Sequence, residues 1–261
     1  MAYASFNGHD QKDRPVNNRV NEAGFNQTKA LAKVYGYMGL GILITAVVCF
    51  FASWFFSSHI NEVIDAGKNL TPWAIALIST WAVSGLICLI LAFVIPVKAA
   101  FGKGSLWFPY ILFTVCMGLL LTVILLSGIK FYIIGEAFGI TTLLFAGMAV
   151  IGWTTKKNLA PVAFIAMALL WAILLIALVG FIAFALNGWS TTQAFWFDLG
   201  IQAAVIVVLL LITMVDTWRI KIILANAGEC ENMYLYGAFV MYSDFISILI
   251  RVILILARTR R

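Results

Sequence analysis

The sequence predicts an all-α integral membrane protein, built as a bundle of seven transmembrane helices. Hydrophobic residues make up 63% of its 261 residues and charged residues only 11%, which gives a mean hydropathy of +1.02. A soluble domain of this size could not bury so many apolar side chains without exposing large patches. The apolar residues also gather in runs of about the 20 residues that a helix needs to cross a bilayer. Only short connectors join the runs, which leaves no room for a sizeable soluble domain.

The chain begins with a polar stretch, residues 1–33, that lacks the apolar core and cleavage site of a secretory signal peptide. Its composition predicts a disordered basic tail, with Lys12, Arg14, Arg19, Lys29 and Lys33. Residues 34–257 form the predicted transmembrane domain, and 258–261 form a basic end. Lipid offers no hydrogen-bond partners, so every backbone group in a span must be paired within the protein. We therefore expect helices for all the spans, at about 34–56, 73–95, 106–127, 135–152, 160–185, 195–216 and 238–257.

Lysine and arginine gather in alternate connectors, so the net charge of +6 indicates membrane orientation rather than a nucleic-acid partner. Besides the tail, the connectors after the second, fourth and sixth spans hold Lys98, Lys103, Lys156, Lys157, Arg219 and Lys221. The other connectors hold only Lys68 and Lys130. The positive-inside rule therefore predicts a cytoplasmic amino terminus. The carboxy-terminal arginines break this pattern, so either the last segment is re-entrant or packing outweighs the charge rule.

Ionisable residues within or at the ends of the spans are few: Glu136, Asp198, Asp216, Asp244 and Arg251. Such residues are functional candidates, because an unpaired charge in hydrocarbon costs at least about 2.5 kcal/mol. Asp198 has a structural explanation, since a carboxylate in the first turn of a helix interacts favourably with the helix dipole.

Asp216 closes the sixth apolar run, and Asp244 lies about two turns into the seventh. Since a cytoplasmic loop joins the two spans, we expect both carboxylates near the cytoplasmic end of the bundle, and two close carboxylates tend to share a proton. Such a pair suits a proton sensor, and in the ionised form it can bind Ca²⁺ transiently. Arg251, about 10 Å further along the last helix, could pair with a carboxylate and latch the bundle closed. The spacing alone leaves open a simpler interpretation, in which Asp216 is a helix-end residue bonded to Arg219 or to the backbone.

Three stretches resemble the Bax inhibitor-1 (transmembrane BAX inhibitor motif) family, and specifically its bacterial members. The stretch "EAFGITTLLFAGMAVIGWTTKKNLA" (136–160) is similar to the signature of the fourth span, with Glu136, Thr141, Thr142, Lys156 and Lys157 as motif residues. "VDTWRIK" (215–221) resembles the end of the family's sixth span, and "YSDFISIL" (242–249) resembles its seventh. The order of the spans matches over residues 34–257.

The resemblance implies a seven-helix bundle whose last helix is surrounded by the other six. It also implies a pH-sensitive calcium leak in a bacterial plasma membrane, with Asp216 and Asp244 as pH sensor and ion gate. A basic residue can latch the sensor in some members; the candidates here are Lys98, Arg219 and Arg251. The family's arginine in the seventh span has no direct match, because position 254 is leucine and Arg251 lies one turn earlier.

Other functions fit the sequence less well. Presenilin-like proteases also use two intramembrane aspartates, but their motif context is absent, as are a Gly-x-Ser-x-Gly elbow, a Walker loop and a His-Glu-x-x-His helix. We therefore expect no enzyme and no cofactor, with the bilayer, Ca²⁺ and protons as partners. The main alternative is a regulatory protein that binds a membrane protease or another partner through its tail and loops. A secondary transporter is third, because no internal repeat is visible.

Overall fold

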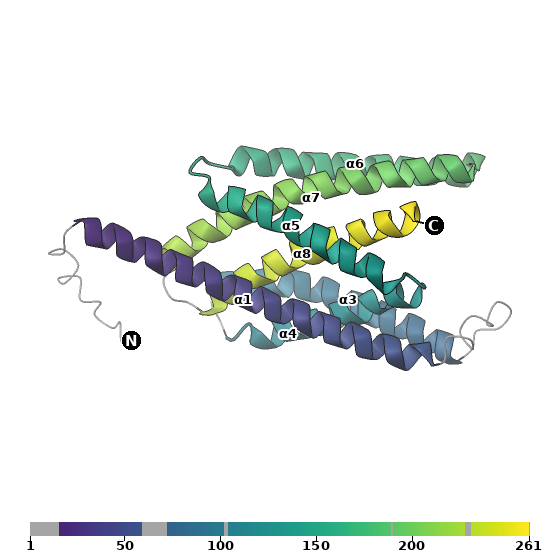
Figure 1. The fold of residues 1–261 in the computed structure, drawn as a ribbon, viewed down its shortest axis with the longest axis horizontal. Helices are drawn as coiled ribbons and strands as arrows, with labels where there is room; N and C mark the ends of the chain where they lie inside the picture. Colours follow the sequence, from purple (N-terminus) through teal and green to yellow (C-terminus); the bar gives the residue numbers. More distant parts are fainter. Residues whose placement is uncertain (1–15, 59–71, 102–103, 189, 228–230, 261) are drawn as a thin grey trace.

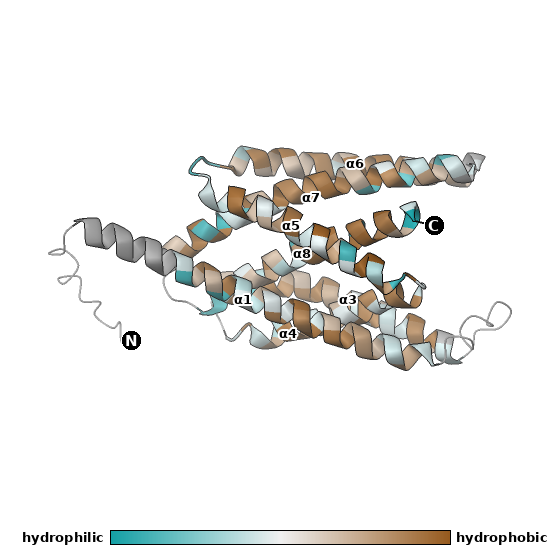
Figure 2. Cartoon of the chain, viewed as in Figure 1, coloured by the Kyte–Doolittle hydropathy of each residue, from teal (hydrophilic) through white to brown (hydrophobic). Residues whose placement is uncertain are grey.

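The structure, a computed structural model, describes residues 16–58, 72–101, 104–188, 190–227 and 231–260. These residues form seven helices and no strand (Figure 1). The helices are α1 (Val16–Ser57), α3 (Pro72–Phe101), α4 (Trp107–Leu126), α5 (Phe131–Thr154), α6 (Ala160–Asn187), α7 (Thr191–Ala227) and α8 (Glu231–Thr259). Each is long and apolar enough to cross a membrane, and Figure 2 shows hydrophobic residues in all seven. The prediction of an all-α membrane bundle is confirmed.

Two helices extend well beyond the predicted spans. Helix α1 begins at Val16, so residues 16–33, which we expected in a disordered tail, are helical; residues 1–15 lie outside the described residues. Helix α7 continues to Ala227 instead of ending at Asp216. The reason is that adding residues to an existing helix costs far less free energy than starting one. An apolar run therefore marks the part of a helix that lies in lipid, not the whole helix.

The last helix, α8, lies at the centre of the bundle. Half of its most apolar stretch (50%) is buried inside the protein, against 6% for α6. Helix α8 packs against α1, α3, α4, α5 and α7, whereas α6 packs mainly on the outer side of α7 (Figure 1). The predicted central position of the last helix is confirmed, with five helices rather than six in close contact with it.

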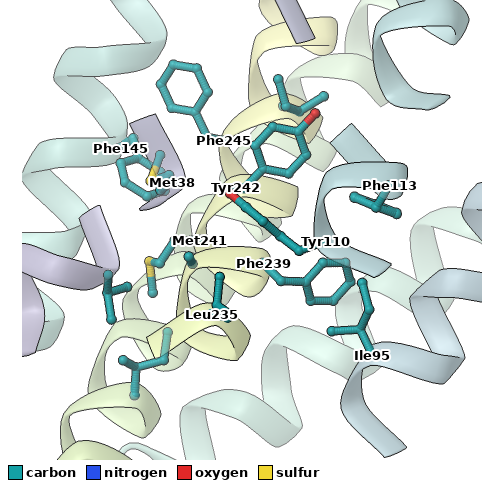
Figure 3. Packing of buried hydrophobic residues seen from close by; sticks show 14 of the residues in the cluster. Met38, Ile95, Tyr110, Phe113, Phe145, Leu235, Phe239, Met241, Tyr242 and Phe245 are labelled. Atoms are coloured by element: carbon teal, nitrogen blue, oxygen red, sulfur yellow. The ribbon is translucent and has the colours of Figure 1, made fainter. Parts of the chain in front are cut away.

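Aromatic side chains of α8 form the middle of the core (Figure 3). Phe239 contacts Phe113 of α4 edge to face, with ring centroids 4.9 Å apart. Phe245 contacts Phe145 of α5 in the same way at 5.6 Å. Such edge-to-face pairs add stabilisation beyond the area that they bury. They fix α8 from two sides, so its other residues have defined positions between the surrounding helices.

Buried hydroxyl groups also attach α8 to its neighbours. The Tyr242 hydroxyl is hydrogen-bonded to the hydroxyl of Thr45 on α1, and Thr45 also contacts the carbonyl oxygen of Thr114 on α4 at 3.0 Å. The backbones of α1 and α4 approach closely here, because a Cβ atom on Gly118 would lie only 2.9 Å from the Thr45 carbonyl oxygen. Small residues allow such approaches between transmembrane helices.

The two ends of the chain's helical part lie at opposite ends of the bundle. Helix α8 is continuous, and its last turn lies at the end opposite to the start of α1 (Figure 1). Its terminal arginines form ion pairs there: Arg258 with Asp198 of α7 at 2.6 Å, and Arg260 with Glu136 of α5 at 2.8 Å. Of the two alternatives for this segment, the geometry favours a full crossing in which packing and pairing outweigh the charge rule.

Candidate functional site

Asp216 lies within helix α7, at a level where α7 packs against α8. Its side chain is 16% exposed, and Oδ1 accepts a hydrogen bond from Nη1 of Arg219, one turn further along, at 3.3 Å. Val215 and Thr217 on either side are buried. Tyr236 of α8 lies close enough to interact electrostatically with Asp216. Since α7 continues to Ala227, Asp216 is not a helix-end residue, and its carboxylate faces the interface between two helices.

Asp244 lies in the central helix and is the more enclosed of the two carboxylates. Its Oδ2 atom is buried and has no hydrogen-bond partner among the described residues. The side chain of Thr213, from α7, lies near the carboxyl group, and its hydroxyl donates to the carbonyl oxygen of Leu209 at 3.0 Å. A buried carboxylate with an unsatisfied oxygen is costly when it is ionised. Groups of this kind cluster at functional sites, so Asp244 is a candidate on physical grounds as well as by motif.

The register of α7 against α8 brings the two aspartates to the same level. The hydroxyl of Thr217 lies 3.7 Å from the sulfur of Met241, which shows this register. Asp216 precedes Thr217, and Asp244 follows Met241 by less than one turn. The two carboxyl groups are consequently close enough to affect each other electrostatically. The structure thus brings together the two residues that the sequence motifs singled out.

Hydroxyl groups lie near this pair, and the sequence motifs do not single them out. Thr213 and Thr217 are buried on the same face of α7, with the Thr217 hydroxyl donating to the Thr213 carbonyl oxygen at 2.8 Å. Tyr35 of α1 lies next to Thr217. The spacing of Thr213 and Thr217, one turn apart and flanking Asp216, is a signal that could have identified the two threonines. Nothing in the sequence indicates the contribution of Tyr35.

The three latch candidates lie in different places. Arg219 contacts Asp216, as described above. Arg251 donates to the side-chain oxygen of Gln202 on α7 at 2.8 Å, and Lys98 donates to the carbonyl oxygen of Ser105 at 2.8 Å. In this structure, therefore, only Arg219 of the three contacts a member of the pair.

The motif residues of α5 are not part of the aspartate site. Glu136 pairs with Arg260 at the far end of the bundle. Thr141 is fully buried, with an oxygen that has no partner in the described part of the chain, and Thr142 donates to its own helix at the Phe138 carbonyl oxygen. Lys156 and Lys157 are exposed in the connection between α5 and α6.

The chemistry open to the site is that of a proton-binding carboxyl pair. Two neighbouring carboxyl groups bind protons in two linked steps. Ca²⁺ takes six to eight oxygen ligands, and among the described residues no group of three or more histidine, cysteine or acidic side chains lies together. The pair with its threonines could contact a cation in transit, but it lacks the ligands of a resident calcium site.

Comparison with known proteins agrees with the motifs. The model of the family described as inhibitor of apoptosis-promoting Bax1, the Bax inhibitor-1 family, matches residues 27–261. The protein belongs to this family. It is also 26% identical over 243 residues to inner membrane protein YbhL of Escherichia coli K12, which covers 88% of this chain and 92% of the relative. YbhL from E. coli O6:H1 matches equally well.

The match to the Bax inhibitor-1 family covers all seven helices except the first turns of α1. It confirms the resemblance carried by residues 136–160, 215–221 and 242–249. Both YbhL relatives are bacterial inner membrane proteins, and this protein is a multi-pass membrane protein.

Proposed function

We propose that the protein is a pH-sensitive calcium (cation) leak whose gate is the Asp216–Asp244 pair. One observation carries the proposal: the central helix places a carboxyl group near a second carboxyl group on a neighbouring helix, and one of its oxygens is buried without a partner among the described residues. A structural role alone would favour a fully paired or apolar contact at this position, because an unpaired buried carboxylate destabilises the fold.

The gating mechanism follows from electrostatics between α7 and α8. When the two carboxyl groups share a proton they can lie close together, whereas two ionised carboxylates repel each other. The repulsion acts across the α7–α8 contact and shifts the equilibrium toward a more open arrangement, as a ligand does when it prefers one of two states. A cation such as Ca²⁺ is attracted to the ionised pair, and the small number of ligands lets it leave again.

A second candidate function is regulation of a membrane protease or another protein partner, without ion conduction. The exposed basic residues Lys156 and Lys157, at the same end of the bundle as the start of α1, support this alternative. Removal of residues 1–15 tests for a partner site in the terminus. A longer deletion through residue 30 would be ambiguous, since Ala30 is part of the buried core.

Calcium influx into proteoliposomes between about pH 6 and 8 tests the leak directly. Asp216→Asn and Asp244→Asn should each flatten the pH dependence of the flux. Asp198→Asn is the matched control, because Asp198 lies on the same helix, pairs with an arginine and is remote from the site; it should behave like the wild type. The sensor assignment is wrong if both site variants retain the wild-type pH dependence. Absence of flux at every pH, in correctly inserted protein, would favour the partner-binding function.

A further inference from the structure

Helices α1 and α5 form the walls of an apolar groove whose floor is α8. Each of the two helices packs closely on α8 but hardly on the other. One cavity of about 480 Å³ lies between them. A second, of about 270 Å³, continues it toward the other end of the bundle, where α4 also lines it, and shares Ile42 and Phe138 with the first. Together they form one groove, and neither Asp216 nor Asp244 lines it.

The groove is open to the lipid and runs through most of the bilayer's thickness. On α1 its lining extends from Leu31 to Phe50, which is about 29 Å of helix and close to the roughly 30 Å of a bilayer's hydrocarbon core. Its lining is almost entirely apolar, and Gly39 on α1 and Ala146 on α5 leave space at its centre. Val150 on the α5 wall is 60% exposed. Its length, its apolar lining and its opening toward the bilayer suit an acyl chain.

One end of the groove is basic. Trp153 lines that end; Lys221 donates to its carbonyl oxygen at 2.7 Å and lies 5.6 Å from the centre of its ring. Lys156 and Lys157 follow in the exposed connection after α5. Within the described residues none of these three lysines forms an ion pair with a carboxylate. Three uncompensated ammonium groups at the mouth of an apolar groove complement an anionic headgroup attached to an acyl chain.

We propose that this groove binds an anionic phospholipid of the bilayer, with an acyl chain between α1 and α5 and the phosphate near Lys221, Lys156 and Lys157. Basic sites between transmembrane helices are a known means of recognising anionic headgroups. A free phosphate would use the lysines alone and leave the groove empty. The lipid uses both features, and its chain lies beside Tyr35, a groove residue that reaches Thr217 near the aspartate pair.

Native mass spectrometry of the full-length protein, titrated with phosphatidylglycerol and with phosphatidylcholine of the same chain length, tests the proposal. The wild type should bind one phosphatidylglycerol in preference to phosphatidylcholine. Lys157→Gln should weaken phosphatidylglycerol binding roughly fivefold, because one basic residue near an anionic headgroup contributes about that factor. Phosphatidylcholine binding should not change. Lys130→Gln, an exposed lysine at the other end of α5, should match the wild type.

A matched pair of glycine substitutions tests the groove itself. A Cβ atom on Gly39 or on Gly36 meets no atom within 4 Å, so both positions accept a side chain, but only Gly39 lines the groove. Gly39→Leu should abolish binding of both lipids, and Gly36→Leu should bind both like the wild type. If Gly39→Leu does not yield folded protein, Ala146→Leu takes its place on the opposite wall.

Three outcomes would overturn the proposal. The first is equal binding of the two lipids by the wild type, and the second is identical lipid binding by the Gly39 and Gly36 variants. The third is a change of oligomeric mass in Gly39→Leu with lipid binding retained, which would assign the groove to a second copy of the chain. None of these results depends on whether the protein conducts ions.

Discussion

Arg219 lies 3.3 Å from Asp216, one turn along the same helix, in the half of α7 that carries the candidate gate. In the first half of α7, Asp198 pairs with Arg258 of α8 at 2.6 Å. Helix α7 thus carries two aspartates that each pair with an arginine, and both arginines are about half exposed. Asp216 also lies near a second carboxyl group, that of Asp244. The two pairs can therefore be compared within one protein.

Arg219→Gln should move the midpoint of the flux–pH curve to higher pH. The cation next to Asp216 favours the ionised carboxylate, so its loss lets the pair hold its proton to a higher pH. The shift should be less than about one pH unit, because solvent screens the charge of Arg219, whose side chain is 55% exposed, and limits such a pair to about 1 kcal/mol. Calcium flux into proteoliposomes at closely spaced pH values measures it. Arg258→Gln is the control and should leave the midpoint in place; equal shifts in both variants would exclude a local effect of Arg219.

The sequence predicted the two aspartates of the site but not their surroundings. A carboxylate in an apolar run is conspicuous because hydrocarbon penalises it, so Asp216 and Asp244 stand out without a structure. Threonine is common in transmembrane helices, so Thr213 and Thr217 do not stand out in the sequence. Only the register of α7 against α8 gives them a role. The contribution of Tyr35 depends on how α1 packs on α7, and hydropathy carries no information on that packing.

Gly152→Ala should destabilise the bundle, because a Cβ atom at this position of α5 collides with the carbonyl oxygen of Met214 on α7. Overpacking of this kind costs about 1–3 kcal/mol. Gly147→Ala is the matched control on the same helix, where a Cβ atom meets nothing within 4 Å; it should be neutral or stabilising by up to about 1 kcal/mol. Thermal unfolding in detergent compares the two. Equal melting temperatures would show that α5 and α7 do not approach as closely as described.

Tyr242→Phe should lower the free energy of unfolding by about 0.5–1.5 kcal/mol, the usual net contribution of one hydrogen bond. It removes the hydroxyl that joins central helix α8 to Thr45 of α1 and keeps the aromatic ring in the core. Tyr132→Phe, at an exposed tyrosine of α5, is the control. Addition of Thr45→Val to Tyr242→Phe should cost less than the sum of the single changes, because both remove the same contact. Strict additivity would argue against the hydrogen bond.

Hydropathy predicted the number and order of the helices, since each apolar run must cross the bilayer as a helix. It failed at the ends of α1 and α7, where Val16 and Ala227 are the limits rather than residues 34 and 216. It also could not decide whether the last segment crosses the membrane. That question depends on contacts between residues far apart in sequence, such as the ion pair of Arg260 with Glu136. A count of the charges in each connector takes no account of such pairs.

A full crossing by α8 predicts that Lys157 and Arg260 lie on opposite sides of the membrane. Lys157→Cys and Arg260→Cys, each in a protein carrying Cys230→Ser, can be labelled with a membrane-impermeant maleimide. The background should be low, because Cys49, Cys88 and Cys116 are buried. With a cytoplasmic amino terminus, as the distribution of lysine and arginine predicts, intact cells should label Arg260→Cys, and Lys157→Cys should react only after permeabilisation.

Lys130→Cys is the internal standard for this experiment, because Lys130 and Arg260 both lie near the ring of Tyr132. The two positions must therefore label on the same side, whatever the orientation of the protein. If Arg260→Cys reacted on the same side as Lys157→Cys and Lys130→Cys reacted on the other, α8 would not cross the membrane, and the ion pairs of its last turn could not form as described. If Lys157→Cys reacted from outside and the other two from inside, α8 would still cross, but the positive-inside prediction would be wrong. The experiment thus separates the fold of α8 from the direction in which the bundle is inserted.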